Sequence, residues 1–429
     1  MNYWYNSYID INNIGVKKTD ILVWAFCFMA IHTLIANFYI PKIEGTTTIF
    51  FLLLLVLYYT TPGKGSITIQ RSIESYIFLV GILAIYSITT IFNLCPPMPI
   101  QLFCLMFAFC FLRISYELQV RIIKCFVWVL AILLLCSIVE FAIYETTGWG
   151  IVLGQTTRVT AVRETHFVNL VFNLIGTFYI DTRFQSIADE PGRIGTLCGM
   201  LLFLSWRVQS LRIPFIVFII GGVISFSLAF FVLLGIFLIT HVRVSLKQLI
   251  IGLAVIGTTI YVTFDRFEEM IVMRIMADGE MEDVEDIDNR TTMVFDKYFD
   301  RAFENGQLWL GVGANNLPEQ IYKESHGGNA GAKKWIFQYG FVALAFLFIA
   351  FNKVFLRRLR GKPDIKDYAF LIAYWLSFYQ RSDVMSPFSI IVFMAIPIID
   401  IIEEYDNPIE EYNSPLEKYD NPIEITITK

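Results

Sequence analysis

The polar residues that could carry out chemistry are concentrated in two stretches between apolar segments. The first holds the string Arg-Phe-Gln-Ser-Ile-Ala-Asp-Glu-Pro-Gly-Arg-Ile-Gly from Arg183 to Gly195, which enters an apolar segment. The second holds Gly311-Val-Gly-Ala-Asn-Asn316 and Ser325-His-Gly-Gly-Asn-Ala-Gly331. Arginine binds phosphate through a bidentate fork, and glycine lets backbone N–H groups approach its oxygens. This pattern favours a site for a phosphate- or diphosphate-bearing lipid.

Further basic and polar residues extend the set of candidates for binding such a substrate. They are Arg158, Arg163, Arg193, Arg290, Lys323, His326 and Asn329. Simpler interpretations stay open: Arg183 as an interfacial anchor, Arg290 as a partner of the neighbouring acidic run, and His326 as an idle loop residue. Glu190 and Pro191 also suit an ordinary helix start, since an acidic group and a proline are both favoured there.

No motif indicates a metal, a cofactor or a nucleic-acid partner. The chain lacks GxxxxGK[ST], HExxH and a GxGxxG after a strand. Its seven cysteines form no CxxC and lie in or beside apolar segments, as small buried hydrophobic residues do. The net charge of −5 argues against nucleic-acid binding. We therefore expect neither metal nor cofactor.

The composition places these stretches in a membrane protein. Of the 429 residues, 56% are AVILMFWYC and 17% are charged, whereas soluble domains have about 25% charged residues. Segments apolar and long enough to cross a bilayer lie at about 21–40, 46–61, 75–95, 98–112, 122–144, 192–206, 246–264, 335–355, 368–380 and 384–402. The fold class we predict is all-α and polytopic, with about twelve transmembrane helices.

For two apolar runs, length alone does not decide how often they cross the membrane, but the distribution of positive charge does. We expect residues 213–241 to turn back on themselves around Gly221-Gly222 and Ser225–Ser227, and residues 167–180 to be interfacial or re-entrant. Lysine and arginine then gather on one side, which marks the cytoplasmic side. Both termini are predicted to be cytoplasmic, with the chain in the bacterial inner membrane.

The predicted topology divides the chain into a membrane domain, 1–402, and a tail, 403–429. The membrane domain carries two long extracytoplasmic loops, at about 145–191 and 265–334. In the acidic tail Tyr405-Asp-Asn-Pro-Ile-Glu recurs, with variation, every seven residues. A proline in each unit excludes a continuous helix, so we expect a disordered cytoplasmic segment or a docking motif for a partner.

Few charged residues fall within the predicted spans. Lys124 and Glu140 lie close enough to span ends to snorkel, and Asp400 is near the end of the last one. His32 lies in mid-span, where we expect a packing histidine. Arg193, just inside a span, either faces a polar cavity or snorkels. A transporter for lipid-linked glycans normally needs more buried charge than this.

Two of these strings give the chain a family resemblance. The stretch from Arg183 to Gly195 resembles the Arg-Phe-x-Ser-x-x-x-Glu-Pro-Gly-x-x-Gly segment of bacterial O-antigen polymerases of the Wzy type. Asp288-Asn-Arg290, Gly311-Val-Gly313, Asn316 and Tyr339-Gly340 resemble the later signature shared by O-antigen polymerases and ligases. Many spans, two long periplasmic loops and cytoplasmic termini match that family's layout.

The resemblance implies a metal-independent membrane glycosyltransferase that polymerises undecaprenyl-diphosphate-linked repeat units into O-antigen or capsular polysaccharide. Arg183 and Arg290 would bind the diphosphate, Glu190 would orient an arginine or act as a base, and His326 or Asn329 would take the place of the ligases' catalytic histidine. Membrane lipid and a chain-length regulator would be partners. The alternatives are an O-antigen ligase with a lipid-core acceptor and a lipid-linked glycan flippase.

Overall fold

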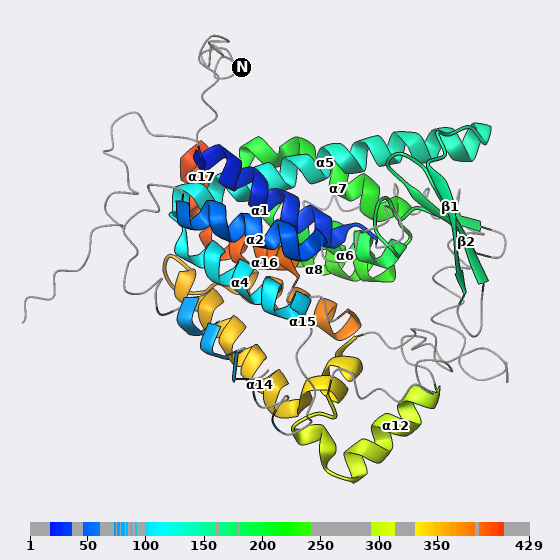
Figure 1. Cartoon of the computed structure of the whole chain (residues 1–429). Helices are drawn as coiled ribbons and strands as arrows, with labels where there is room; N and C mark the ends of the chain where they lie inside the picture. Colours follow the sequence, from blue (N-terminus) through cyan, green and yellow to red (C-terminus); the bar gives the residue numbers. More distant parts are fainter. Residues whose placement is uncertain are drawn as a thin grey trace, which may run out of the picture.

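The computed structural model shows a bundle of helices with a small sheet at one end (Figure 1). It describes residues 18–36, 46–60, 73, 75–77, 79–81, 83–84, 87, 91, 99–159, 164–178, 181–241, 293–313, 331–381 and 386–406. The elements up to the sheet are α1 (Lys18–Leu34), α2 (Thr46–Thr60), α4 (Pro99–Arg113), α5 (Tyr116–Thr147), β1 (Gly154–Val159), β2 (Glu164–Asn169), β3 (Leu174–Phe178) and β4 (Asp181–Arg183). Those that follow are α6 (Pro191–Ser205), α7 (Arg212–Ile224), α8 (Leu228–His241), α12 (Met293–Glu304), the short η4 (Gln307–Trp309), α14 (Ala332–Arg358), α15 (Ile365–Gln380), α16 (Pro387–Ala395) and α17 (Ile399–Asp406).

Helix α6 lies at the centre of the bundle. It packs against α7 and α8 on one side and contacts α15 and α16 on another. Its Phe203 meets Phe237 of α8 and Phe370 of α15 with ring centroids 5.5 and 5.6 Å apart, in the edge-to-face geometry that aromatic rings prefer. These contacts fix the direction of α6, and with it the position of the Glu190–Arg193 segment at its start.

Two of the described helices, α5 and α14, are long and apolar enough to cross a membrane. At 1.5 Å per residue α5 is about 48 Å long, more than the roughly 30 Å of a hydrocarbon core. Helix α14 is interrupted at Gly340, where φ is 85° and ψ is 168°. Shorter apolar helices of 10–17 residues accompany them. The mostly helical architecture agrees with the predicted class, while the predicted span at 246–264 lies outside the described residues.

Residues 213–241 turn back on themselves, as their length and charge pattern predict. Helix α7 ends at Ile224 and α8 begins at Leu228, and Phe226 between them has a positive φ of 46°. The tip of this hairpin packs on α6 so closely that a Cβ on Gly195 would lie 2.7 Å from Oγ of Ser227. The turn therefore lies beside the start of α6.

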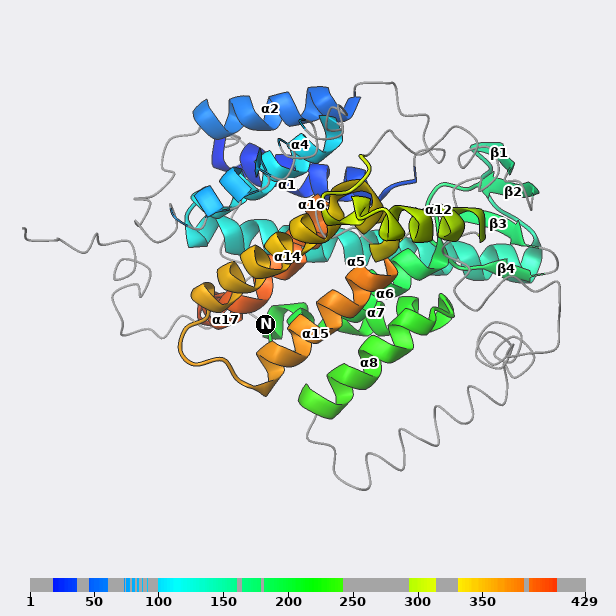
Figure 2. The same ribbon diagram turned by 90° about the horizontal axis from the view of Figure 1, so that it is seen from below.

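A four-stranded antiparallel sheet in the order β1-β2-β3-β4 follows α5 (Figures 1 and 2). The described part of the segment predicted to be interfacial or re-entrant, 167–178, forms the end of β2, a turn and β3, and is thus a β-hairpin. Side chains alternate between faces of a strand: His166 is exposed and lies 3.1 Å from Thr157, while Phe167 is buried. The neighbouring strands satisfy backbone groups that would be unpaired in a single interfacial segment.

Glu140 of α5 holds the sheet against the helix. The sequence predicts instead that its side chain reaches from near a span end to the membrane surface. The carboxylate accepts hydrogen bonds from the backbone N–H groups of Val171 and Phe172, at 3.0 and 2.8 Å, and from Nδ2 of Asn173 at 3.0 Å. Asn173 also donates to the carbonyl oxygen of Ser137, at 2.7 Å. Glu140 is therefore the acceptor that holds the β2–β3 turn against the helix, and not a surface charge.

At the opposite end of the bundle, which we call the α17 end, ion pairs join α17 to the neighbouring segments. Arg207 at the end of α6 binds Asp400 and Glu403 at 2.6 and 3.0 Å. Arg360 binds Glu404 at 2.5 Å, and Lys124 of α5 pairs with Asp406. The predicted disordered tail is thus wrong for residues 403–406, which continue α17 because these basic partners hold them. Residues 407–429 lie outside the described part.

Candidate functional site

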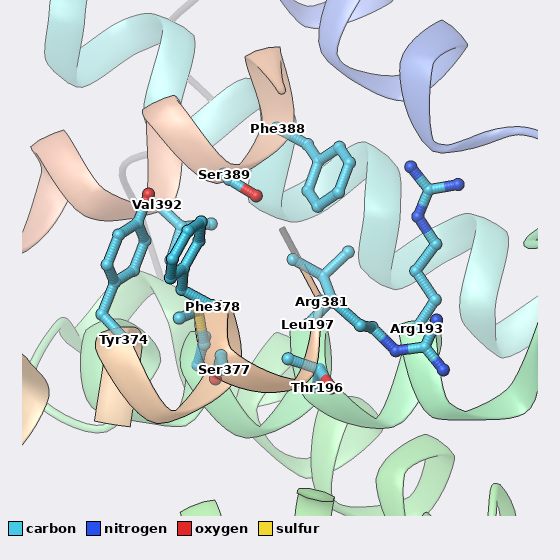
Figure 3. A pocket seen from close by; sticks show the side chains of 11 residues that line it. Arg193, Thr196, Leu197, Tyr374, Ser377, Phe378, Arg381, Phe388, Ser389 and Val392 are labelled. Atoms are coloured by element: carbon cyan, nitrogen blue, oxygen red, sulfur yellow. The ribbon is translucent and has the colours of Figure 1, made fainter. Parts of the chain in front are cut away.

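A pocket between α6, α15 and α16 lies at the sheet end of the bundle and is the best candidate for a site (Figure 3). The space between its walls is about 440 Å³, including the part that is open to the outside. The lining residues are Arg193, Thr196, Leu197, Met200, Tyr374, Ser377, Phe378, Arg381, Phe388, Ser389 and Val392. Two arginines thus enter a pocket whose remaining walls are mainly aromatic and aliphatic.

Arg381 enters the pocket from the end of α15. Its backbone N–H donates to the carbonyl oxygen of Ser377 at 2.8 Å, and its own φ and ψ are extended, so the helix stops here. The guanidinium lies over the first turn of α6, where a Cβ on Gly192 would be 2.6 Å from Nη2. The absence of a side chain at Gly192 therefore makes room for Arg381. Among the described residues, Nε of Arg381 has no hydrogen-bond partner.

Glu190 forms an ion pair with Arg381, with Oε2 and Nη2 2.5 Å apart. The arginine side chain is only 16% exposed and the carboxylate 47%. Glu190 precedes Pro191 at the start of α6, but its side chain makes no capping hydrogen bond. The carboxylate is therefore directed to Arg381 and does not serve the helix start.

Arg193 approaches the same pocket from α6 and is held by three elements. It binds Asp189 one turn earlier at 3.2 Å, and its Nη2 donates to the carbonyl oxygen of Thr33 in α1 at 3.2 Å. Its guanidinium also lies over the ring of Phe388 in α16, 5.3 Å from the centroid. Cation–π contact of this kind holds a guanidinium in a fixed place. Arg193 therefore enters a pocket with mainly apolar walls, and its polar partners, Asp189 and Thr33, lie at the edge of α6 and in α1.

The carboxylates of Asp189 and Glu190 balance the charges of the two arginines in the pocket. The paired arginines and carboxylates carry no net formal charge together, but Asp189 and Glu190 are more exposed than their partners. Two hydroxyls of the lining, those of Thr196 and Ser377, donate to helix carbonyl groups at 2.8 Å. The arginines are therefore the groups best able to exchange their partners for the oxygens of an anionic ligand.

The two parts of the later sequence signature touch each other. Gly311 and Gly340 have positive φ values of 78° and 85°, and a Cβ on Gly340 would be 2.5 Å from the backbone N of Gly311. The N–H groups of Val312 and Gly313 donate to the carbonyl oxygens of Phe337 and Gln338, at 2.7 and 3.1 Å. The Gly-Val-Gly segment thus satisfies the carbonyl groups that the break of α14 at Gly340 leaves free.

The start of α14 is placed next to Arg381 by a further close approach. Gly331 has a φ of 86°, and a Cβ there would be 2.7 Å from the carbonyl oxygen of Tyr379 in α15. Trp335, one turn later, packs on Phe378 of the pocket wall with ring centroids 6.1 Å apart. The signature glycines and the pocket are therefore connected through α14 and α15.

Several residues predicted for the site lie outside what the structure describes. The backbones of Arg158 and Arg183 belong to β1 and β4, and their side chains are outside the described part. The wholly undescribed residues are Arg163, Arg290, Asn316, Lys323, His326 and Asn329. Of the candidates that are described, Glu190 and Arg193 come together at the pocket, and Gly311 and Gly313 lie against α14.

Arg381 is the residue of the pocket that sequence reasoning missed. Arg381 and Lys42 are the only basic residues in the short loops predicted to be extracytoplasmic. Since positive charge is disfavoured there, its presence at Arg381 indicates a functional role. His32, by contrast, packs as predicted: its ring lies 5.8 and 5.5 Å from those of Phe28 and Phe50.

Fold and site together define a mostly helical protein with two candidate membrane-spanning helices and a pocket containing two arginines. No known protein family, curated protein or solved structure matches the chain.

Proposed function

We propose that the protein is a membrane glycosyltransferase that polymerises undecaprenyl-diphosphate-linked oligosaccharide repeat units into O-antigen or capsular polysaccharide. The observation that carries this function is the pocket that Arg193 and Arg381 share. Glu190 and Arg193 belong to the stretch from Arg183 to Gly195, which resembles a segment of O-antigen polymerases. An apolar and aromatic wall with an arginine at each of two places suits a diphosphate joined to a polyprenyl chain.

The charge distribution supports an orientation in the bacterial inner membrane. Arg121, Lys124 and Arg207 lie at the α17 end, whereas the sheet lies at the other end of α5. Since positive charge favours the cytoplasmic side, the α17 end is cytoplasmic and the pocket lies toward the periplasm. About twelve spans, with both termini cytoplasmic, complete this topology.

The reaction forms a bond between a hydroxyl oxygen of the acceptor unit and the anomeric carbon of the growing glycan. The bond from that carbon to the diphosphate breaks, and undecaprenyl diphosphate leaves with the electron pair. Arg193 and Arg381 stabilise the charge that develops on the leaving group, a contribution worth about 10²–10³ in rate for each donor. Neither metal nor cofactor is needed, because diphosphate is already a good leaving group.

Glu190 orients Arg381 through their ion pair. When a diphosphate binds, its oxygens replace the carboxylate at the guanidinium, and the exposed Glu190 is free to move toward solvent. The resemblance assigns the proton of the acceptor hydroxyl to a base at His326 or to Glu190 itself. A base at this step adds about 10²–10⁴ in rate.

A strain lacking this chain, complemented with single variants, tests the assignment. Arg381→Ala should reduce the surface-glycan ladder to core plus one repeat, and Arg381→Lys should restore it in part because lysine keeps the charge but not the fork. Arg301→Ala, an exposed arginine of α12, is the matched control and should give a full ladder.

The same gel separates the alternatives. Bare core with accumulated lipid-linked polymer would indicate a ligase, and lipid-linked units held on the cytoplasmic face would indicate a flippase. A full ladder from Arg381→Ala, at wild-type levels of protein in the membrane, would contradict the role of the pocket.

A further inference from the structure

Arg358, the last residue of α14, is a buried charge without a counterion among the described residues. It is only 3% exposed, and no carboxylate in the described part lies within ion-pair distance of it. Its Nη2 donates to Oε1 of Gln119 at 2.5 Å. Nε and Nη1 are buried, with no hydrogen-bond partner in the part of the chain that the structure describes.

The groups around Arg358 belong to the first turn of α5. Gln119 is fully buried, and its Nε2 donates to the carbonyl oxygen of Ile114 at 3.0 Å, which turns its Oε1 toward the guanidinium. The guanidinium lies 5.6 Å from the ring centroid of Tyr116. The first turn of this long helix adds the partial positive charge of its N–H groups. The cation therefore faces neutral groups and a second positive potential.

This arrangement differs from that of four other basic residues at the α17 end. Arg207, Arg360 and Lys124 each have a carboxylate from α17, and Arg121 pairs with Asp20 of α1. The carboxylate of Glu117, also in the first turn of α5, lies near the hydroxyl of Tyr405, at 3.4 Å. Burial of an unpaired charge is costly, so an anion from outside the chain that bound Arg358 would stabilise the structure.

We propose that Arg358 and the first turn of α5 form a binding site for a phosphate group, supplied by the headgroup of an anionic phospholipid. A phosphate monoanion or diester offers several oxygens as acceptors for Nε and Nη1, and hydrogen bonds between such charged partners are among the strong ones. Basic pockets between helices at the cytoplasmic surface bind lipid headgroups in this way. The site lies at the end of the bundle opposite the two-arginine pocket, and it shares with the proposed function only the membrane setting.

Native mass spectrometry of the full-length protein, released from nanodiscs of mixed phosphatidylglycerol and phosphatidylcholine, tests the site. We expect wild-type protein to retain phosphatidylglycerol in preference to phosphatidylcholine. Arg358→Gln should lower that retention at least about tenfold, the effect of losing one charge-assisted hydrogen bond. Arg357→Gln, the exposed neighbour with the same change of charge, is the control and should retain it.

Two further measurements keep the site testable if Arg358→Gln fails to fold. Arg358→Lys, which keeps the charge but loses the fork, should show an intermediate loss. In delipidated wild-type protein, an increase in melting temperature with phosphatidylglycerol but not with millimolar inorganic phosphate assigns the site to a headgroup. An equal increase with both assigns it to the phosphate group alone and overturns the lipid source. Equal retention of both lipids by wild-type protein, or equal loss in Arg357→Gln, overturns the site itself.

Discussion

Gly311 and Gly340 lie backbone against backbone, and neither position has room for a Cβ. A Cβ on Gly311 would be 2.6 Å from the carbonyl oxygen of Gln338, and one on Gly340 would be 2.5 Å from the backbone N of Gly311. The contact fixes the break in α14 and therefore the direction in which its first segment approaches α15.

Gly340→Ala should destabilise the protein by about 2–5 kcal/mol, because it combines strain at an unfavourable φ with an overlap. Thermal unfolding in detergent measures this change. Gly148→Ala is the matched control: Gly148 also has a positive φ, of 67°, but nothing lies within 4 Å of its Cβ position. Equal losses in the two variants would mean that the close contact with Gly311 contributes nothing.

Glu140→Ala should lower the free energy of unfolding by about 2–4 kcal/mol, because two backbone N–H groups and the amide of Asn173 lose their acceptor. The β2–β3 turn should also become sensitive to limited proteolysis. Glu117→Ala, an exposed glutamate of the same helix, should cost no more than about 1 kcal/mol. An intact turn in Glu140→Ala would show that the hydrogen bonds to α5 do not hold the sheet.

Asp364 caps α15, and its replacement should reveal a pH-dependent contribution to stability. Burial alone would raise the pKa of Asp364, but the N–H groups of Asp367 and Lys366 that donate to it lower the pKa below its ordinary value. Its contribution is therefore present above about pH 4, the ordinary range of the unfolded side chain, and is lost as the pH falls through the folded pKa.

Asp364→Ala should cost about 0.5–2 kcal/mol at neutral pH, and Asp364→Asn should keep most of the cap while removing its pH dependence. Melting curves from pH 3 to pH 7 test both expectations. A wild-type curve with the same slope as that of Asp364→Asn would contradict the role of the carboxylate.

The role of Arg290 in binding the diphosphate is predicted from the sequence alone. Arg290→Ala should abolish polymer without loss of protein from the membrane, and Arg290→Lys should restore it only in part, because the resemblance gives this residue a diphosphate to bind. Surface-glycan gels alongside a membrane immunoblot give the answer. Full polymer in the alanine variant would remove Arg290 from the site.

How much the sequence predicts depends on whether the information is local. The reversal within 213–241 follows from a run too long for one helix and from the charges beside it. The sheet at β1–β4 was missed because an apolar run with Asn169 and Asn173 resembles a re-entrant segment until its neighbouring strands are known. Ion-pair partners far apart in the chain, such as Glu190 and Arg381, leave no pattern in a single sequence.

The start of α15 and the end of α17 show the same difference between local and distant information. Asp364 and Asp367 form a capping box that local spacing alone explains. The extension of α17 to Asp406 depends instead on Arg207, Arg360 and Lys124, which come from distant segments. The acidic composition after residue 402 therefore predicted a solvated tail where partners across the bundle produce a helix.

Polymerisation in liposomes tests the central claim most directly. The purified protein would be reconstituted with lipid-linked repeat units extracted from a strain that lacks it, and the products separated by length. Wild-type protein should produce a ladder with release of undecaprenyl diphosphate, and Arg193→Ala and Arg381→Ala should each slow it about 10²–10³-fold. A wild-type protein that forms no polymer, or arginine variants as active as wild type, would contradict the account.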